Sequence, residues 1–433
     1  MVTNTRTVAV HVPVLARVEG EGALHLRIRD SQIEELRLEI YEPPRLFEKF
    51  LEGRSYEELP ELVARICGIC PVAYQMSAIN AVESLAETDP GPWVKAMRRL
   101  MYYGEWIQSH ALHIHLLAAP DFFGYDSAIA MAKDHPRLVR RGMRLQDLGN
   151  ALIRLLGARS IHPVGVKMGG FHRAPALKEA TALKVQLEDA LQDAEDLVAW
   201  AAGVGVPARD QDVTLLALDE PGNYPILDGN IASNRGQSFA VSEFEEHIFE
   251  HQVAGSTALF SLFDHQPYLV GPLARLNLNL DFLPESVRKL AVKTGIHWPS
   301  GNMFHSMTAR AIEICYGITD AIRILEDYGE PGHASVPVRP PEGVGYGATE
   351  APRGLLWHKY ELDGKGLIRS ARIVPPTSQN QARIEQDLQH SLTAFGLDRP
   401  DKELQLHCEQ VIRNFDPCIS CATHFLRLST ERL

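Results

Sequence analysis

Hydrophobic and polar residues alternate along the first forty positions and then repeat with a helical period. Segments 8–14, 23–28 and 33–40 alternate, which predicts three short strands. From residue 55 onwards, apolar residues recur every three or four positions with charged residues between them. This spacing predicts helices over the ranges 71–85, 93–117, 137–156, 174–202, 302–328 and 379–394.

The patterns are weaker in the middle and near the end of the chain. Residues 242–262 are predicted to form one or two helices, and residues 330–354, rich in proline and glycine, a long ordered loop at a site or an interface. Segments 355–362 and 366–374 predict a hairpin, and a cysteine-rich loop is expected in the tail. No repeat or flexible linker interrupts the chain. We therefore expect one large, mainly α-helical body with small β-sheets near each end, an α+β fold.

Composition and charge exclude several classes of protein. The 433 residues are 45% hydrophobic and 23% charged, as in ordinary folded proteins. Lys and Arg number 43 and Asp and Glu 55, so the net charge is −12, which argues against binding to nucleic acid or anionic membranes. No apolar run approaches about 18 residues, and the start of the chain lacks a secretory signal. We therefore expect no membrane insertion and a cytoplasmic location.

Four of the six cysteines form two Cys-x-x-Cys pairs, Cys67 with Cys70 and Cys418 with Cys421. Each pair can bind one metal through both sulfurs, and four thiolates suit zinc, nickel or iron–sulfur chemistry. A structural zinc site is one interpretation, but zinc ribbons place their pairs about 15–20 residues apart. Here the pairs are 418 − 67 = 351 residues apart. A site closed across almost the whole chain forms only after the body has folded, which favours an inserted catalytic cofactor.

The cysteine pairs and their surroundings resemble the two signatures of the nickel–iron hydrogenase large subunit. The two segments are Arg65-Ile-Cys-Gly-Ile-Cys-Pro71 and Asp416-Pro-Cys-Ile-Ser-Cys-Ala-Thr-His424. Further blocks resemble the family in the same order along the chain: Arg17-Val-Glu-Gly20, Phe47-Glu48, Gly53-Arg54, Ser160-Ile-His-Pro163, Gly169-Gly170 and Glu350-Ala-Pro-Arg-Gly354. The resemblance covers essentially the whole chain. It is greatest to the cytoplasmic, NAD(P)-linked group, the sulfhydrogenase alpha subunits among them, and it implies the large-subunit fold.

The resemblance implies a nickel–iron centre. Cys67 and Cys418 would be terminal ligands of nickel, and Cys70 and Cys421 would bridge nickel to an iron that carries carbon monoxide and cyanide. Polarizable thiolates stabilise several oxidation states of nickel. Hydrogen would be split heterolytically, with the proton on a terminal thiolate, Cys418.

Three further residues have roles by the same resemblance. Glu19 matches the glutamate that relays the proton, and a carboxylate can do so within hydrogen-bond reach of the sulfur. Arg353 would place a fixed positive charge beside the metals and the cyanides. Thr377 would donate a hydrogen bond to a cyanide, although it can equally be a turn residue.

The resemblance also implies a second metal and a processed tail. Glu48, the carbonyl of Arg372 and His424 would bind a structural ion, usually magnesium, with iron as an alternative because of the imidazole. Residues 425–433 fit a C-terminal extension that a maturation protease removes. The expected domain therefore covers residues 1–424.

Some positions depart from the pattern of the family. Many relatives have histidine at the position of Tyr74 and aspartate at the position of Ser109. His110 and His113 lie three residues apart on one predicted helix, and we expect them to be packed and hydrogen-bonded rather than metal ligands. The other two cysteines have no neighbouring cysteine, and we expect both to be buried as small apolar residues: Cys315 and Cys408.

These features predict the catalytic subunit of a nickel–iron hydrogenase, which cleaves H2 reversibly into protons and electrons. The chain has no further cysteines for iron–sulfur clusters and no dinucleotide fingerprint. Electrons would therefore leave through an iron–sulfur small subunit and then flavin-containing NAD(P) diaphorase subunits. The alternative is a non-catalytic scaffold subunit of a hydrogenase-like respiratory complex, stabilised by zinc or by its cysteines. Such subunits lose the cysteines, so the presence of all four argues against it.

Overall fold

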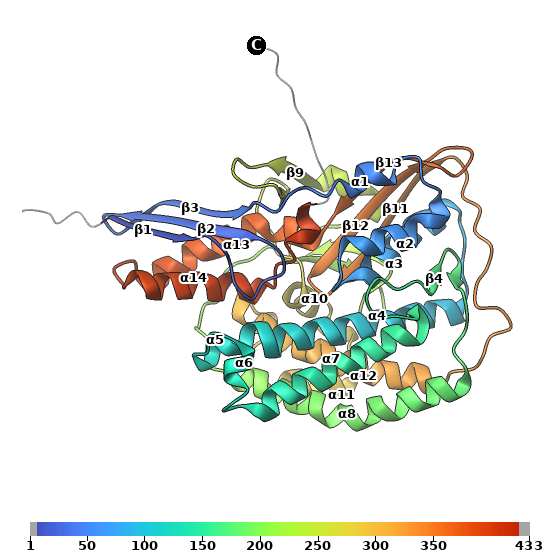
Figure 1. Ribbon diagram of the computed structural model, residues 1–433, viewed down its shortest axis with the longest axis horizontal. Helices are drawn as coiled ribbons and strands as arrows, with labels where there is room; N and C mark the ends of the chain where they lie inside the picture. Colours follow the sequence, from blue (N-terminus) through green and yellow to red (C-terminus); the bar gives the residue numbers. More distant parts are fainter. Residues whose placement is uncertain (1–6, 424–433) are drawn as a thin grey trace, which may run out of the picture.

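The computed structural model describes residues 7–423, and a layer of long helices forms one side of the molecule (Figure 1). The central helix α4 is buried along almost all of its second half, as expected of a helix surrounded by others. It packs closely against α7, and Gly104 makes this possible. A Cβ at that position would lie 2.7 Å from the Gly149 carbonyl oxygen and would push the two helices apart. The four long helices are α4 (Pro92–Leu112), α7 (Pro136–Gly157), α8 (Leu177–Gly203) and α12 (Ser306–Glu326).

Shorter helices surround this layer. The helix α3 (Pro71–Leu85) begins directly after the first cysteine pair, and α13 (Pro376–Phe395) and α14 (Asp401–Phe415) precede the second pair. A π-helix, His113–Ala118, continues α4. The others are α1 (Phe47–Leu51), α2 (Leu59–Val63), α5 (Ala119–Phe123), α6 (Ala128–Met131), α9 (Phe244–His247), α10 (Pro272–Asn279) and α11 (Glu285–Lys293).

The strands form small antiparallel sheets, most of them on the opposite side from the long helices (Figure 1). The first sheet contains β1 (Thr7–Val12), β2 (Gly22–Arg29) and β3 (Gln32–Ile40). Another contains β11 (Gly343–Ala351), β12 (Gly354–Leu362) and β13 (Ile368–Val374), with β13 at the edge. The smaller sheets pair β4 (Val166–Lys167) with β5 (Gly170–Phe171), β6 (Leu216–Asp219) with β7 (Asn230–Ser233) and β8 (Ser238–Phe239), and β9 (Ile248–Gln252) with β10 (Leu259–Phe263).

The predicted class, mainly α with small sheets, is confirmed, and so are the three N-terminal strands, the long helices and the β12–β13 hairpin. Two predictions were wrong. Residues 242–262 contain the end of a 3-10 turn, the short helix α9, the strand β9 and the beginning of β10. The chain reverses between the two strands, where Gly255 has φ +88°, a conformation that a helix cannot contain. Residues 343–351, predicted as loop, form the strand β11. The helix α14 was not predicted.

Glycines explain the error at β11. A Cβ on Gly345 or Gly347 would collide with backbone carbonyl oxygens of α3, those of Ala81 and Ser77. The missing side chains therefore let the strand lie directly against the helix. In the sequence the same glycines are indistinguishable from those of a loop.

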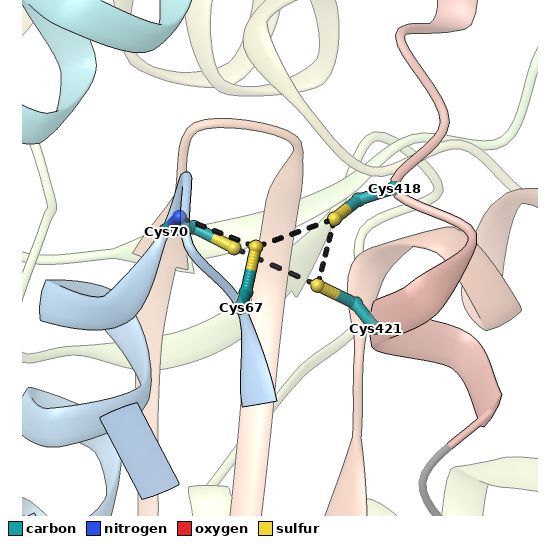
Figure 2. A group of neighbouring side chains, drawn as sticks. All are labelled: Cys67, Cys70, Cys418 and Cys421. Carbon is teal, nitrogen blue, oxygen red and sulfur yellow. Dashed lines mark hydrogen bonds between the residues drawn. The ribbon is translucent and has the colours of Figure 1, made fainter. Parts of the chain in front are cut away.

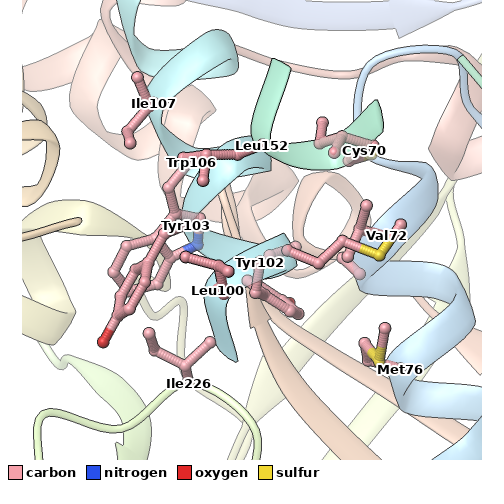
Figure 3. Close-up of a cluster of buried hydrophobic side chains, with 14 of the residues drawn as sticks. Cys70, Val72, Met76, Leu100, Tyr102, Tyr103, Trp106, Ile107, Leu152 and Ile226 are labelled. Atoms are coloured by element: carbon pink, nitrogen blue, oxygen red, sulfur yellow. The ribbon is translucent and has the colours of Figure 1, made fainter. Parts of the chain in front are cut away.

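One large hydrophobic core joins the helices and contains all four paired cysteines. Figure 3 shows part of it, where Cys70, Val72 and Met76 of the α3 segment lie near Leu100 and Trp106 of α4. No helix within residues 7–423 is long and apolar enough to cross a membrane. The cysteines thus lie where the core meets the chain segments from both ends.

Candidate metal centre

The two cysteine pairs meet in the folded chain (Figure 2). The Cys67 and Cys418 sulfurs are 3.5 Å apart, those of Cys70 and Cys421 are 3.7 Å apart, and those of Cys418 and Cys421 are 2.8 Å apart. All four sulfurs lie within 4.8 Å of one another, and no disulfide joins them. Each cysteine is at most 4% exposed. Within residues 7–423, no other group of three or more His, Cys, Asp or Glu side chains comes together in this way.

Residues near the N-terminus hold the second pair in place. The Ile419 N–H donates to the Glu19 carbonyl at 2.9 Å, and Glu19 and Cys418 form an isolated parallel β-bridge. Gly20, with φ +89°, makes this approach possible, because a Cβ there would lie 2.7 Å from the Cβ of Ile419. The Arg45 N–H donates to the Thr423 carbonyl at 2.7 Å. The C-terminal segment is therefore anchored between its two cysteines and again two residues after the second.

Helix α4 holds the first pair. The Cys67 sulfur accepts hydrogen bonds from the N–H groups of Ile69 and Cys70, at 3.3 and 3.4 Å. Cys70 is the N-cap of α3, as its position before Pro71 predicted, but its side chain does not cap the helix. Instead the carboxylate of Glu105 on α4 accepts the N–H groups of Val72 and Ala73, at 2.6 and 3.0 Å. Nothing in the sequence near α3 marks this cap.

The four thiols fit a cation-binding role. Hydrogen bonds from the other three thiols, that of Cys418 first, lower the pKa of Cys67, whereas burial raises the pKa of Cys418 and of Cys421. Four thiolates this close repel one another, so they are all ionised together only when a cation compensates their charge. Thiolate sulfurs are the ligands that soft metals such as nickel and iron prefer. The donor set therefore fits the expected metal pair.

Glu19 lies at hydrogen-bond distance from the centre. Its Oε2 accepts from the Cys418 thiol at 3.2 Å and from the Ser420 N–H at 3.0 Å. Burial, with the charge of Cys67, raises the pKa of Glu19 above its ordinary value, and the two hydrogen bonds oppose this shift. A carboxylate with a raised pKa accepts a proton more readily at neutral pH. The geometry is that of a proton acceptor for Cys418.

Arg353 and Thr377 line a small cavity beside the sulfurs. Arg353 donates to the Asp416 carbonyl oxygen at 2.7 Å and to the Asp416 Oδ1 at 3.0 Å. Burial alone would lower the pKa of Arg353, but Asp416 and the cysteines outweigh it and raise it, so the guanidinium stays charged. The Thr377 hydroxyl accepts the Cys418 N–H at 2.9 Å, and its own hydrogen remains able to donate. The cavity has a volume of only about 10 Å³ and is lined by Cys70, Tyr74, Ala351, Arg353, Leu356, Pro376, Thr377, Cys418 and Cys421.

A buried network of charged side chains, which the sequence analysis did not predict, supports the loop that carries Arg353. Arg275 is fully buried and pairs with Glu313 at 2.8 Å and with Glu350 at 3.0 Å. It also donates to the carbonyl oxygens of residues 351 and 352, at 2.7 and 3.3 Å. Because both glutamates and both carbonyls are distant from Arg275 in the chain, no local pattern could have revealed this cluster.

Glu48, expected as a ligand of a second metal, lies on α1 beside the edge strand β13. Its Oε1 accepts the Ile373 N–H at 2.8 Å. The N–H and C=O groups of one strand residue point to the same side, so the Ile373 carbonyl also faces α1 and the Arg372 carbonyl faces β12. The expectation that the Arg372 carbonyl accompanies Glu48 is therefore wrong by one position. His424 lies outside the described residues.

The remaining singled-out residues are part of the packed interior. His110 pairs with Glu313 at 2.8 Å, and His113 contacts the Arg413 carbonyl oxygen at 2.8 Å, so the expected hydrogen-bonded role is confirmed. Cys315 and Cys408 are buried outside any disulfide, and burial raises the pKa of each to about 12. Ser109 lies 3.4 Å from an Arg353 nitrogen.

Fold and site together define a metal-dependent redox subunit, and comparison with known proteins identifies its family. The family model for nickel-dependent hydrogenase matches residues 45–145 and 262–424. The sulfhydrogenase 1 alpha subunit of Pyrococcus furiosus is 32% identical over 422 residues, 96% of this chain and 97% of that protein. The HoxS beta subunit of the NAD-reducing hydrogenase of Cupriavidus necator is 26% identical over 461 residues, 95% of this chain and 94% of that protein.

Solved structures agree. The crystal structure of an NAD+-reducing [NiFe]-hydrogenase superposes with a TM-score of 0.87 at 29% identity, over 97% of this chain and 100% of that chain. A [NiFeSe] hydrogenase from Desulfovibrio vulgaris Hildenborough shares the fold, with a TM-score of 0.78 at 21% identity, over 98% of this chain and 100% of that chain. The chain belongs to the nickel-dependent hydrogenase family. It is a catalytic large subunit of a nickel–iron hydrogenase, and the scaffold alternative is not favoured.

Proposed function

We propose that this chain cleaves H2 heterolytically and that its electrons pass through an iron–sulfur small subunit and flavin-containing subunits to NAD(P). The observation that carries the proposal is the convergence of four unbridged thiols within 4.8 Å, with a glutamate 3.2 Å from one of them. Likeness to a sulfhydrogenase subunit and to NAD-reducing hydrogenases supports the acceptor. No second cysteine cluster lies within the described residues, so the electrons need a partner.

The four cysteines have distinct places in the proposed centre. All four would hold the nickel–iron pair, Cys67 and Cys418 as ligands of nickel alone and Cys70 and Cys421 as ligands shared with iron. When bound, the nickel–iron pair supplies the Lewis-acid and redox site at which the H–H bond is polarised. The cavity beside the sulfurs has a mainly apolar lining, and Arg353 and Thr377 would be the hydrogen-bond donors for cyanides on the iron.

The chain's own residues handle the proton. The Cys418 sulfur takes it up and donates it to the Glu19 Oε2, 3.2 Å away. Asp416 orients Arg353 through two hydrogen bonds, so a fixed positive charge lies beside the sulfurs at no further cost of reorganisation. Burial of all these groups strengthens their interactions, because little water is present to screen the charges.

A second, structural ion completes the proposal. Glu48, the Ile373 carbonyl and His424 form the ligand set for magnesium or iron, with Ile373 in place of Arg372. Residues 1–424 form one domain, and a maturation protease removes residues 425–433. We propose a cytoplasmic location, as for a soluble NAD(P)-linked complex.

The test is purification of the native complex with its partner subunits. We expect nickel and iron in equal amounts at this centre, infrared bands from carbon monoxide and cyanide, and H2-dependent reduction of NAD or NADP. Zinc alone, with no infrared bands, would support a scaffold subunit instead. Metal loading and H2 oxidation with viologen dyes, but with neither nicotinamide, would overturn only the acceptor.

A further inference from the structure

Tyr74 places a phenol hydroxyl beside the sulfur cluster. It lies in the first turn of α3, four residues after Cys70, and is 1% exposed. It lines the same small cavity as Cys70, Cys418 and Cys421. Within the described chain its hydroxyl has no hydrogen-bond partner. An unsatisfied buried hydroxyl costs about 1–3 kcal/mol, so its presence at this position needs an explanation.

The surroundings of Tyr74 point to sulfur as its acceptor. Its ring packs on His358, with the ring centroids 5.7 Å apart, whereas the cavity that Tyr74 lines is shared with Cys70, Cys418 and Cys421 and not with His358. Burial, followed by the negative charges of Cys421, Cys70 and Cys418 in that order, raises the pKa of Tyr74. A phenol has an ordinary pKa of about 10, so at neutral pH the hydroxyl carries its proton and can donate it to a thiolate sulfur, which only accepts.

We propose that the Tyr74 hydroxyl donates a hydrogen bond to the Cys421 sulfur and so sets how much electron density this ligand gives to the metals. The inference rests on the proposed function, in which Cys421 bridges the two metals. Hydrogen bonds to a ligand sulfur withdraw electron density from it and tune the metal site. Tyr74 is a positioning residue, because it acts through Cys421 rather than on hydrogen itself.

The direction of the effect follows from this chemistry. Without the hydrogen bond, Cys421 becomes a stronger donor and the iron becomes richer in electrons. Electron-rich iron weakens the bonds within its carbon monoxide and cyanide ligands. In Tyr74→Phe, we therefore expect the infrared bands to shift to lower wavenumber and the reduction potential of the centre to fall, with nickel and iron content unchanged.

The folding of the variant can be checked independently. The proposed hydrogen bond needs Cys421 as a metal-bound thiolate, so Tyr74→Phe should not lower the melting temperature of the metal-free chain. Tyr74→His supplies another N–H donor and should return the bands toward their wild-type positions. Tyr102→Phe is the matched control: Tyr102 is also fully buried, but its hydroxyl donates to Thr349 at 2.9 Å, away from the cavity lining.

The outcomes separate this inference from the proposed function. Bands of Tyr74→Phe that coincide with those of the wild type would overturn it, and so would a shift that Tyr74→His does not reverse or that Tyr102→Phe reproduces. A wild-type complex without nickel, iron or infrared bands would instead overturn the proposed function.

Discussion

At the scale of single residues, surroundings give the same amino acid opposite properties. Cys67 receives hydrogen bonds from its neighbouring thiols, which lower its pKa, whereas burial raises the pKa of Cys408 to about 12. The first is prepared to be a thiolate ligand, and the second remains a protonated thiol in the core. In the sequence, Cys67 has a partner cysteine three residues later, and Cys408 has none.

Replacement of Cys67 by serine should abolish metal loading. A serine hydroxyl is a hard, weakly acidic ligand that does not replace a soft thiolate, so we expect nickel per chain to fall at least about tenfold. Cys408→Ser is the matched control, since Cys408 is a buried cysteine outside the centre. Elemental analysis measures the difference. A fully metallated, active Cys67→Ser protein would contradict the assignment.

Glu19→Gln should separate proton transfer from metal binding. Glutamine keeps the size and the hydrogen-bonding capacity of glutamate but cannot take a proton from Cys418. We expect unchanged nickel and iron content and a loss of H2/D2O exchange of about 10²–10⁴-fold. Glu21→Gln, at an exposed side chain two residues away, should retain exchange. Exchange at the wild-type rate in Glu19→Gln would show that the proton leaves by another route.

At the scale of elements, α4 supports the site although it provides no ligand. Its Glu105 caps α3 directly after Cys70, and its Gln108 donates to the Ile69 carbonyl at 2.6 Å. The cysteine loop is thus held against a largely buried helix. Burial raises the pKa of Glu105 well above its ordinary range, while the two backbone N–H groups oppose the shift.

Removal of this cap should weaken both the fold and the site. In Glu105→Ala, the N–H groups of Val72 and Ala73 lose their acceptors, which we expect to lower the free energy of unfolding by about 2–4 kcal/mol and to reduce metal content. Urea denaturation and elemental analysis test this. Glu61→Ala removes an exposed glutamate that pairs with Arg65 and should change stability by under about 1 kcal/mol. Equal effects of the two variants would contradict the role of Glu105.

The end of α4 and the π-helix after it should make the protein sensitive to acid. Burial lowers the pKa of His110 to about 4 and of His113 and His115 to about 3, so all three are neutral in the folded state. In the unfolded chain they bind protons below about pH 6.5. Stability is therefore fully present above this value and falls as pH decreases toward 4, by about 1.4 kcal/mol per histidine and pH unit. Urea midpoints at pH 7, 6 and 5 measure the slope, and a flat profile would contradict it.

At the scale of the whole molecule, the centre joins segments from both ends of the chain. Glu19 aligns with Cys418 near the C-terminus, and Arg45 binds the Thr423 carbonyl. In Figure 1 these N-terminal (blue) and C-terminal (red) segments lie side by side above the helix layer. Metal binding at the four cysteines should therefore stabilise both ends together.

Hydrogen exchange can test this coupling. On metal loading, we expect protection to increase in residues 67–73 and 416–423 together, because a ligand that binds only the folded state suppresses the opening of every segment that contributes a ligand. The protection of the surface helix α11 should change little, because it contains none of the four cysteines and is distant from all of them in the sequence. Protection gained in only one of the two cysteine segments would contradict a shared centre.

The sequence was most informative where residue type itself carries the chemistry. The cysteine pairs, Glu19 and Arg353 could be named from their motifs alone, because thiolate, carboxylate and guanidinium groups have few alternative uses in such motifs. Glu105 and Arg275 could not, since their partners are distant in the chain and leave no local spacing to detect. The choice of Arg372 rather than Ile373 arose because the pairing of β13 with β12 decides which backbone carbonyls point toward α1. The sequence does not reveal that pairing.

By itself, then, the sequence determined the family, the α+β class, the long helices and the four cysteines of the candidate centre, because helical periodicity and metal-binding motifs are local properties of the chain. Only the tertiary structure decided that β11 is a strand, that Glu105 caps the cysteine helix and that Tyr74 faces the sulfurs. These features depend on which distant surfaces pack together. Burial, register and the supply of hydrogen-bond partners arise from that packing and not from neighbouring residues.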